Sequence, residues 1–257
     1  MTAPIARIFS SLAVVAVTTA CGGSYYEIPL ETPIRPKLDT SGFERILVAG
    51  FIAGGTEDVD GNVETTRLLR SQLRSQSDMR VIDSDVLPLV EVANETRVAS
   101  DSTAEGEDQS MPAAILEDED LVPYEHLFAD AEYWKQIGEE YQQPLIVTGT
   151  VMFAPQERSG IIQNDREVYD SFGRRSVVPV RTYMERTGFV LKPRFVFIDG
   201  RTGAVLYSEN FREEVLYNAN QTSPALSAYF ELMDRLLPSF LSTLSTQTIK
   251  GTRVLLQ

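Results

Sequence analysis

Apolar residues form two kinds of pattern along this chain, unbroken runs and helical stripes, and together they predict an α/β fold. The run over 46–51 is unbroken, as in a strand that is buried on both faces of a sheet, and 145–153 predicts a further strong strand. After the first run, a helical stripe over 63–75, which Asn62 is expected to cap, leads to a short strand over 79–83. A strand, a helix and a strand in close succession indicate a βαβ unit.

The second half of the chain adds two helices and a hairpin to this prediction. A helical stripe predicts a helix over 127–142, and alternating apolar residues over 189–197 predict a strand that turns at 199–203 and returns. A last helix is expected to begin after Ser223 as its cap, and a terminal strand over 252–256 is expected to return to the sheet.

We therefore predict one α/β (α+β) domain over 43–257, with a mixed β-sheet flanked by helices and two inserted segments. The segment 96–122 is acidic and poor in aromatic residues, so it is expected to be a disordered loop. The segment 155–178 is polar and is expected to be irregular. Before the domain, the segment 21–42 holds three prolines and is expected to be an extended tether without regular pairing.

The amino terminus has the organisation of a secretory signal peptide over 1–20. Arg7 is the only charged residue there, and it precedes an apolar stretch that is shorter than the ~20 residues that span a bilayer. The sequence Thr-Thr-Ala that leads into Cys21 resembles the lipobox of bacterial lipoproteins. This resemblance implies that Cys21 begins the mature chain and carries lipid, including palmitate. The alternative is a plain signal peptide followed by an incidental cysteine.

Composition narrows the classes of partner that the protein can have. Cys21 is the sole cysteine, so no internal disulfide explains it, whereas lipid attachment directly after an export signal does. The formal net charge is -14, whereas nucleic-acid binding needs a clustered basic surface. Nucleic acid is therefore excluded as a partner, and the acidity is explained most simply by solubility.

The order of elements resembles a known group of envelope proteins. The two most telling pieces are a helix followed by a strand that contains Thr148-Gly149-Thr150, and a hairpin turn with Asp199 and Thr202-Gly203. They resemble the α/β domain shared by the amino-terminal part of TolB, the curli-secretion lipoprotein and the lipoprotein activator of a penicillin-binding protein. The resemblance covers roughly 43–257 without the two insertions. It implies a binding or assembly module and brings no catalytic residues.

A search for chemistry along the sequence is mostly negative. His126 is the only histidine and Cys21 the only cysteine, which argues against a catalytic triad and against a zinc site. Residues 58–64 resemble a calcium-binding loop, but Gly61 stands in the wrong register. The pair Gly54-Gly55 lacks the spacing of a phosphate-binding loop. We therefore expect no enzyme and no cofactor.

Two functional hypotheses remain after this search. The first is a non-enzymatic lipoprotein that binds an envelope protein partner, with Ser171, Phe172, Arg174 and Arg175 as candidate contacts on an otherwise acidic domain. The alternative is an oligomeric secretion or assembly subunit, similar to the curli-secretion lipoprotein, which inserts hairpins into the outer membrane. Since neither alternating phase of 161–170 is apolar, we expect no membrane pore.

The residue after Cys21 bears on the location of the protein. Gly22 stands there rather than an aspartate. By resemblance to enterobacterial lipoprotein sorting, this favours a lipid anchor in the outer membrane with the domain facing the periplasm. The sequence leaves the oligomeric state and the identity of the partner open.

Overall fold

The computed structural model describes residues 25–101, 114–169, 171–218, 221 and 223–256. The chain forms two compact units. The larger is Pro36–Ser245, and the smaller consists of the two ends of the chain, Met1–Arg35 and Thr246–Gln257. The predicted signal peptide and Cys21 lie outside the described residues.

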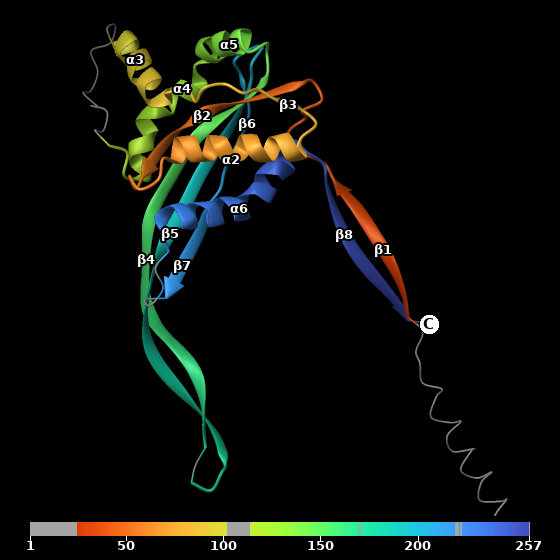
Figure 1. Ribbon diagram of the computed structural model, residues 1–257, viewed down its shortest axis with the longest axis vertical. Coiled ribbons are helices and arrows are strands. Elements are labelled where there is room, and N and C mark those ends of the chain that lie inside the picture. The colour runs from red at the N-terminus through yellow and green to blue at the C-terminus, as the bar shows by residue number, and fades with distance from the viewer. Residues whose placement is uncertain (1–24, 102–113, 170, 219–220, 222, 257) are drawn as a thin grey trace, which may run out of the picture. The chain divides into compact units, whose positions relative to one another are not determined.

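The larger unit contains a six-stranded mixed sheet (Figure 1). Its strands are β2 (Arg45–Gly55), β3 (Arg80–Val81), β4 (Leu145–Tyr169), β5 (Arg175–Asp199), β6 (Val205–Asn210) and β7 (Glu213–Asn218). The order is β3-β2-β4-β5-β6, with β7 also beside β5. β2 is parallel to β3 and β4, whereas β5 is antiparallel to its neighbours. The predicted α/β class with a mixed sheet is thus confirmed.

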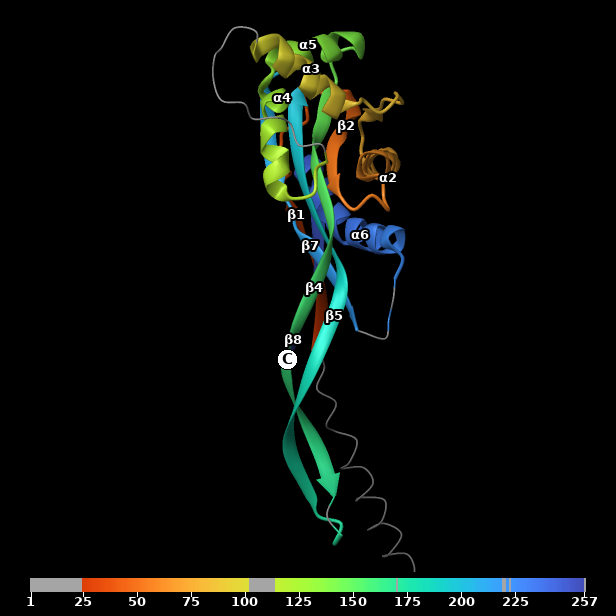
Figure 2. The same ribbon diagram turned by 90° about the vertical axis from the view of Figure 1, so that its left-hand side faces the viewer.

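Helices cover both faces of this sheet (Figures 1 and 2). One core lies beneath α2 (Gly61–Gln76) and α6 (Ala225–Leu244). The other lies beneath α3 (Leu89–Asp101), the 3-10 helix η1 (Asp118–Tyr124), α4 (His126–Ala129) and α5 (Ala131–Glu140). Neighbouring residues of a strand point to opposite faces, so β2 sends Ile46 into one core and Leu47 into the other. Within the described residues, no helix has the length and hydropathy to cross a membrane.

Capping side chains change two of the predicted helices. The helix predicted over 127–142 is broken, because Asp130 accepts hydrogen bonds from the backbone N–H groups of Glu132 and Tyr133 and so starts α5 anew. The cap of α2 is Asp60, not Asn62 as predicted. The Asn62 side chain instead accepts a hydrogen bond of 2.7 Å from the backbone N–H of Phe51, which ties the helix to β2.

Residues 155–169 and 175–178, from the segment that was predicted to be irregular, are paired strands of one hairpin. β4 and β5 pair from Leu145 opposite Asp199 to Tyr169 opposite Arg175 without a shift of register. The prediction was wrong because strands are recognised by one apolar face, and this part of the hairpin buries neither face.

The acidic segment 96–122 is ordered at both of its ends, which corrects the expectation of a disordered loop there. Its first residues continue α3, and its last ones enter η1. The backbone N–H of Gly55 donates a hydrogen bond of 2.9 Å to the carbonyl of Ile115, and Leu121 is buried in the core. These contacts, which composition does not reveal, hold 114–122 against the sheet. Residues 102–113 lie outside the described part.

The smaller unit is a two-stranded antiparallel sheet of β1 (Tyr25–Ile34) and β8 (Gln247–Leu256). The expectation that 252–256 joins the main sheet is wrong, and so is the expectation of an unpaired tether over 25–34. Pro29 and Pro33 are four residues apart and have the same orientation in a strand. Both can therefore face the free edge and leave the ladder with β8 intact.

Candidate functional site

The outer part of the β4–β5 hairpin is the most exposed regular structure of the larger unit (Figures 1 and 2). We call 156–169 of β4 and 175–188 of β5 the outer ribbon. The pairing of β4 with β2 ends at Phe153, and β7 reaches β5 only from Arg186 onward. In the described part of the chain, both edges of the ribbon beyond these points are without a partner strand. Fourteen residues at about 3.3 Å each make it roughly 45 Å long.

The register of the ribbon sorts its side chains into two faces, since residues paired across an antiparallel ladder lie on the same face. The face with even residue numbers, which we call the arginine face, holds Gln156, Arg158, Gly160, Ile162, Asn164, Arg166, Val168, Ser176, Val178, Val180, Thr182, Met184, Arg186 and Gly188. The odd face, which we call the carboxylate face, holds Glu157, Ser159, Ile161, Gln163, Asp165, Glu167, Tyr169, Arg175, Val177, Pro179, Arg181, Tyr183, Glu185 and Thr187.

Large apolar side chains are exposed on this ribbon. Ile161 and Tyr183 lie opposite each other on the carboxylate face and are 71% and 61% exposed. On the arginine face, the half-buried Ile162 and Met184 line a shallow cavity of about 180 Å³ beside Gly160. Two-stranded ribbons are marginally stable in water without a surface to cover them. The outer ribbon is therefore the part of the larger unit most suited to contact another molecule.

The predicted contact residues lie at the tip of the ribbon. The guanidinium of Arg174 lies over the ring of Phe172, 5.5 Å from its centroid, and Phe172 is 82% exposed. Arg175 forms an ion pair with Glu167 on the neighbouring strand. Ser171 is exposed in the turn. The structure thus brings Phe172 and Arg174 together, whereas Arg175 is engaged within the ribbon.

Sequence reasoning missed the arginine face, which is a larger feature than the tip. Arg158, Arg166 and Arg186 come from two strands, and only the register places them on one side. Alternation of charge within 156–169 was a usable signal, because Glu157, Asp165 and Glu167 are odd and the arginines even. It could be read as a face only once the segment was known to be a strand.

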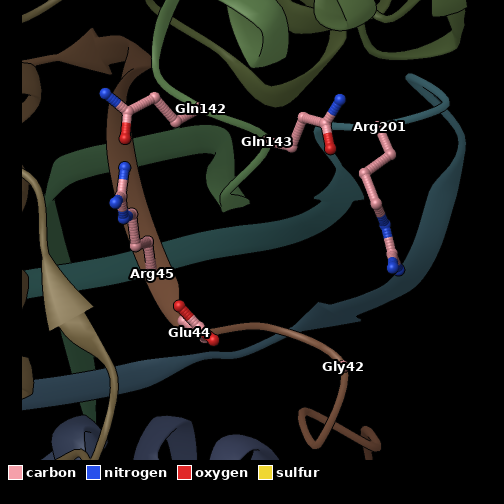
Figure 3. A pocket seen from close by; sticks show the side chains of 6 residues that line it. All are labelled: Gly42, Glu44, Arg45, Gln142, Gln143 and Arg201. Atoms are coloured by element: carbon pink, nitrogen blue, oxygen red, sulfur yellow. The ribbon is translucent and has the colours of Figure 1, made fainter.

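A second candidate is a polar pocket of about 300 Å³ beside the start of β2 (Figure 3). Its lining is formed by Gly42, Glu44, Arg45, Gln142, Gln143 and Arg201. Gln142 and Gln143 have φ angles of 65° and 56°, which side-chain-bearing residues rarely adopt. This left-handed pair ends α5, and Gln143 donates a backbone hydrogen bond to Gly138. The unusual backbone therefore has a role in joining α5 to β4.

Arg201, one of the two arginines of this pocket, is engaged within the fold. Arg201 donates to both oxygens of Asp199, at 3.0 and 3.2 Å, and stacks on Phe43 at 4.8 Å. Burial opposes ionisation of Asp199, but the Arg201 hydrogen bonds outweigh it and hold the pKa of that carboxyl below its usual value. The pair stabilises the β5–β6 turn. With the charge of Arg201 neutralised by Asp199, Glu44 and Arg45 are the charged side chains that remain in the lining.

The other residues singled out by the sequence have local contacts. The Nδ1 atom of the exposed His126 lies 2.8 Å from the carbonyl oxygen of Pro123. Of the residues that resembled a calcium loop, Asp60 caps α2 and Asn62 binds the backbone of β2. Over the described ranges, no group of three histidine, cysteine, aspartate or glutamate side chains is placed to hold a metal ion.

Comparisons with known proteins leave the family open. No family model and no curated protein matches the chain. The lipoprotein GNA1162 from Neisseria meningitidis matches in structure with a TM-score of 0.35 and 11% identity, over 77% of this chain and 97% of that one. A neuraminyllactose-binding hemagglutinin homologue from Helicobacter pylori matches with a TM-score of 0.33 and 8% identity, over 81% and 86%. Similarity at this level transfers neither family nor function, and the resemblance to the TolB group stays a prediction.

Proposed function

We propose that this chain is a lipid-anchored bacterial envelope protein that binds a protein partner through its outer ribbon, without catalysis. The observation that carries the proposal is that a ribbon of fourteen residue pairs continues beyond the sheet with both faces exposed. A two-stranded ribbon gains little from burial by itself, so a partner that covers it would add the burial that it lacks. The exposed Phe172 at its tip supports the same role.

Lipid attachment at Cys21 is the first part of the proposal to test. It is supported by the signal-like amino terminus that ends at the sole cysteine. Cells that express the chain should incorporate labelled fatty acid into it, and Cys21→Ser should abolish the label and release the protein from membranes. Absence of label in the natural chain, or a mature chain that starts elsewhere, would contradict the anchor. Fractionation with the outer membrane is the expected location, since Gly22 follows the cysteine.

Binding through the ribbon is the second part. A photo-crosslinking amino acid in place of Phe172 should give a defined covalent adduct with a protein in intact cells. The matched control carries the same amino acid at Arg67, an exposed position on α2. Adducts at both positions, or at neither, would argue against the ribbon as the contact surface.

A second candidate function is an oligomeric secretion or assembly subunit that resembles the curli-secretion lipoprotein. The regular pairing of 156–169 with 175–188 favours it, because such a role requires a hairpin rather than an irregular insertion. Charge on both faces argues against membrane insertion, as each arginine at the bilayer midplane costs about 2–4 kcal/mol. We expect the purified protein to give no ion conductance in planar bilayers. Defined channels would favour this second candidate instead.

A further inference from the structure

The charged residues of the outer ribbon are distributed unevenly between its two faces. The arginine face has three arginines, Arg158, Arg166 and Arg186, and none of its fourteen residues is a carboxylate. The carboxylate face holds all four acidic residues of the two segments and two arginines. The two faces of one ribbon therefore carry opposite net charge.

Part of this charge has no partner within the ribbon. Arg158 forms an ion pair of 3.1 Å with Glu214 on β7, and Glu167 pairs with Arg175. Within the described residues, neither Arg166 nor Arg186 makes an ion pair with a carboxylate, and Arg186 Nε lies 3.1 Å from the sulfur of Met184. Asp165 and Glu185 are similarly without a basic partner in the described chain. Glu157 and Arg181 on the carboxylate face likewise make no ion pair in the described chain. The unpaired charges are thus two arginines on the arginine face, and three carboxylates with one arginine on the carboxylate face.

Apolar residues alternate with these charges at matching intervals. On the arginine face, Met184 is two residues from Arg186. On the carboxylate face, Tyr183 is two residues from Glu185. Residues on one face of a strand recur every 6–7 Å, so an acidic and an apolar group of one ribbon can meet a basic and an apolar group of another. Both faces wind with the twist of the ribbon (Figures 1 and 2). Two copies have the same twist, so their strands can align to within about 30°, as in sheets that pack face to face.

We propose that the arginine face of one outer ribbon packs on the carboxylate face of the outer ribbon of a second copy of this chain. The inference rests on the proposed function, in which the ribbon is a protein-binding surface, and it names the partner. Free arginines meet free carboxylates, and the Ile162–Met184 cavity receives an apolar side chain such as Tyr183. Because two different faces are joined, each copy keeps one face available for a further copy, and association continues into a ring or a filament.

Crosslinking between single-cysteine variants tests which faces meet. Thr182 lies on the arginine face and Gln163 on the carboxylate face, both exposed near the middle of the ribbon. In the full chain with Cys21→Ser, a mixture of Thr182→Cys and Gln163→Cys should give a covalent dimer with a short bismaleimide. Each variant alone should give at least ten-fold less dimer. Efficient dimers of Thr182→Cys alone would overturn the proposal, because they would join two arginine faces.

Charge reversal in the same background provides the second test. Arg166→Glu with Arg186→Glu should weaken association, measured by sedimentation, at least ten-fold, and so should Asp165→Arg with Glu185→Arg. A mixture of the two double variants should associate again, since the reversed arginine face now fits the reversed carboxylate face. Arg67→Glu on α2 is the matched control and should leave association unchanged. High salt should also weaken it, because salt screens such contacts.

The outcomes separate this inference from the proposed function. A chain that stays monomeric at high concentration, or one that associates regardless of both reversals, overturns self-association. If the Phe172 photo-crosslink then joins a different protein, the ribbon still binds a partner and the proposed function stands. If the crosslinker at Phe172 captures no protein, the proposed function itself falls.

Discussion

The inner and outer halves of the β4–β5 hairpin share one hydrogen-bonded ladder but have different surroundings. In the inner half, 145–155 with 189–199, side chains such as Phe195 and Ile198 are fully buried beneath helices on both faces. In the outer ribbon the same register continues with no covering layer, and most side chains are exposed. Backbone pairing alone therefore extends the hairpin, whereas burial stabilises its inner half. The uncovered half is the one available to a partner.

The largest expected effect on stability comes from truncating a large side chain in the core around the inner half. Phe195 packs its ring against Phe51, Phe211 and Phe240, with centroids 4.8 to 5.8 Å apart. Phe195→Ala should lower the free energy of unfolding by about 3–5 kcal/mol, as for other buried aromatic residues. For the monomer, Tyr183→Ala in the outer ribbon should change it by about 0.5 kcal/mol or less, because the side chain is exposed. Urea unfolding measures both, and equal losses would show that the ribbon is as tightly packed as the core.

Two glycines of β4 extend the comparison of the inner half with the outer ribbon to the backbone. Gly149 has φ 143°, and a Cβ there would lie 1.8 Å from the carbonyl oxygen of Arg194, whereas a Cβ at Gly160 meets nothing within 4 Å. Gly149→Ala should therefore cost about 1–3 kcal/mol in strain. Gly160→Ala should be neutral or stabilise by about 0.5 kcal/mol, because alanine loses less backbone entropy. A loss at Gly160 in urea unfolding would mean that the ribbon is covered.

A third prediction concerns how stability depends on alkaline pH. Tyr229 packs edge-on against Phe153 of the inner half. Burial raises the pKa of its phenol above the usual value, although the Thr65 hydroxyl opposes this. Above about pH 10 the unfolded chain loses this proton while the folded chain keeps it, so stability falls as the pH rises. Tyr229→Phe should flatten this alkaline decline in unfolding experiments. A decline of unchanged slope would place its origin elsewhere.

The smallest expected effect concerns the ion pair of Arg175 with Glu167 in the outer ribbon. Both side chains are exposed, so the pair is screened by solvent, and Glu167→Gln should cost about 0.5 kcal/mol or less. The effect should be smaller still at high salt. A loss above 1 kcal/mol in urea unfolding would indicate that the pair is shielded by an associated chain.

Sequence reasoning succeeded where a long apolar pattern reflects a covered face. The strands at the start of β2 and β4, the β5–β6 hairpin and the helix α6 were all predicted, because each presents apolar residues to a core. It failed for α3 and β7, which were not predicted, and for the break at Asp130, where a local cap outweighs an apolar stripe. At the candidate site it found Phe172 and Arg174 at the tip but not the arginine face.

The sequence by itself thus determined that the strongly apolar segments, such as 46–51, 145–153 and α6, enter the core, since apolar spacing follows directly from burial on a helix or strand. Tertiary structure alone decided that 156–169 and 175–188 form a ribbon, that β8 pairs with β1, and that Arg158, Arg166 and Arg186 share a face. The physical reason is that pairing between strands joins backbone groups, which every residue carries. Where no face is buried, the side chains carry no apolar pattern that identifies the neighbouring strand. The pairing is then visible only in the tertiary structure.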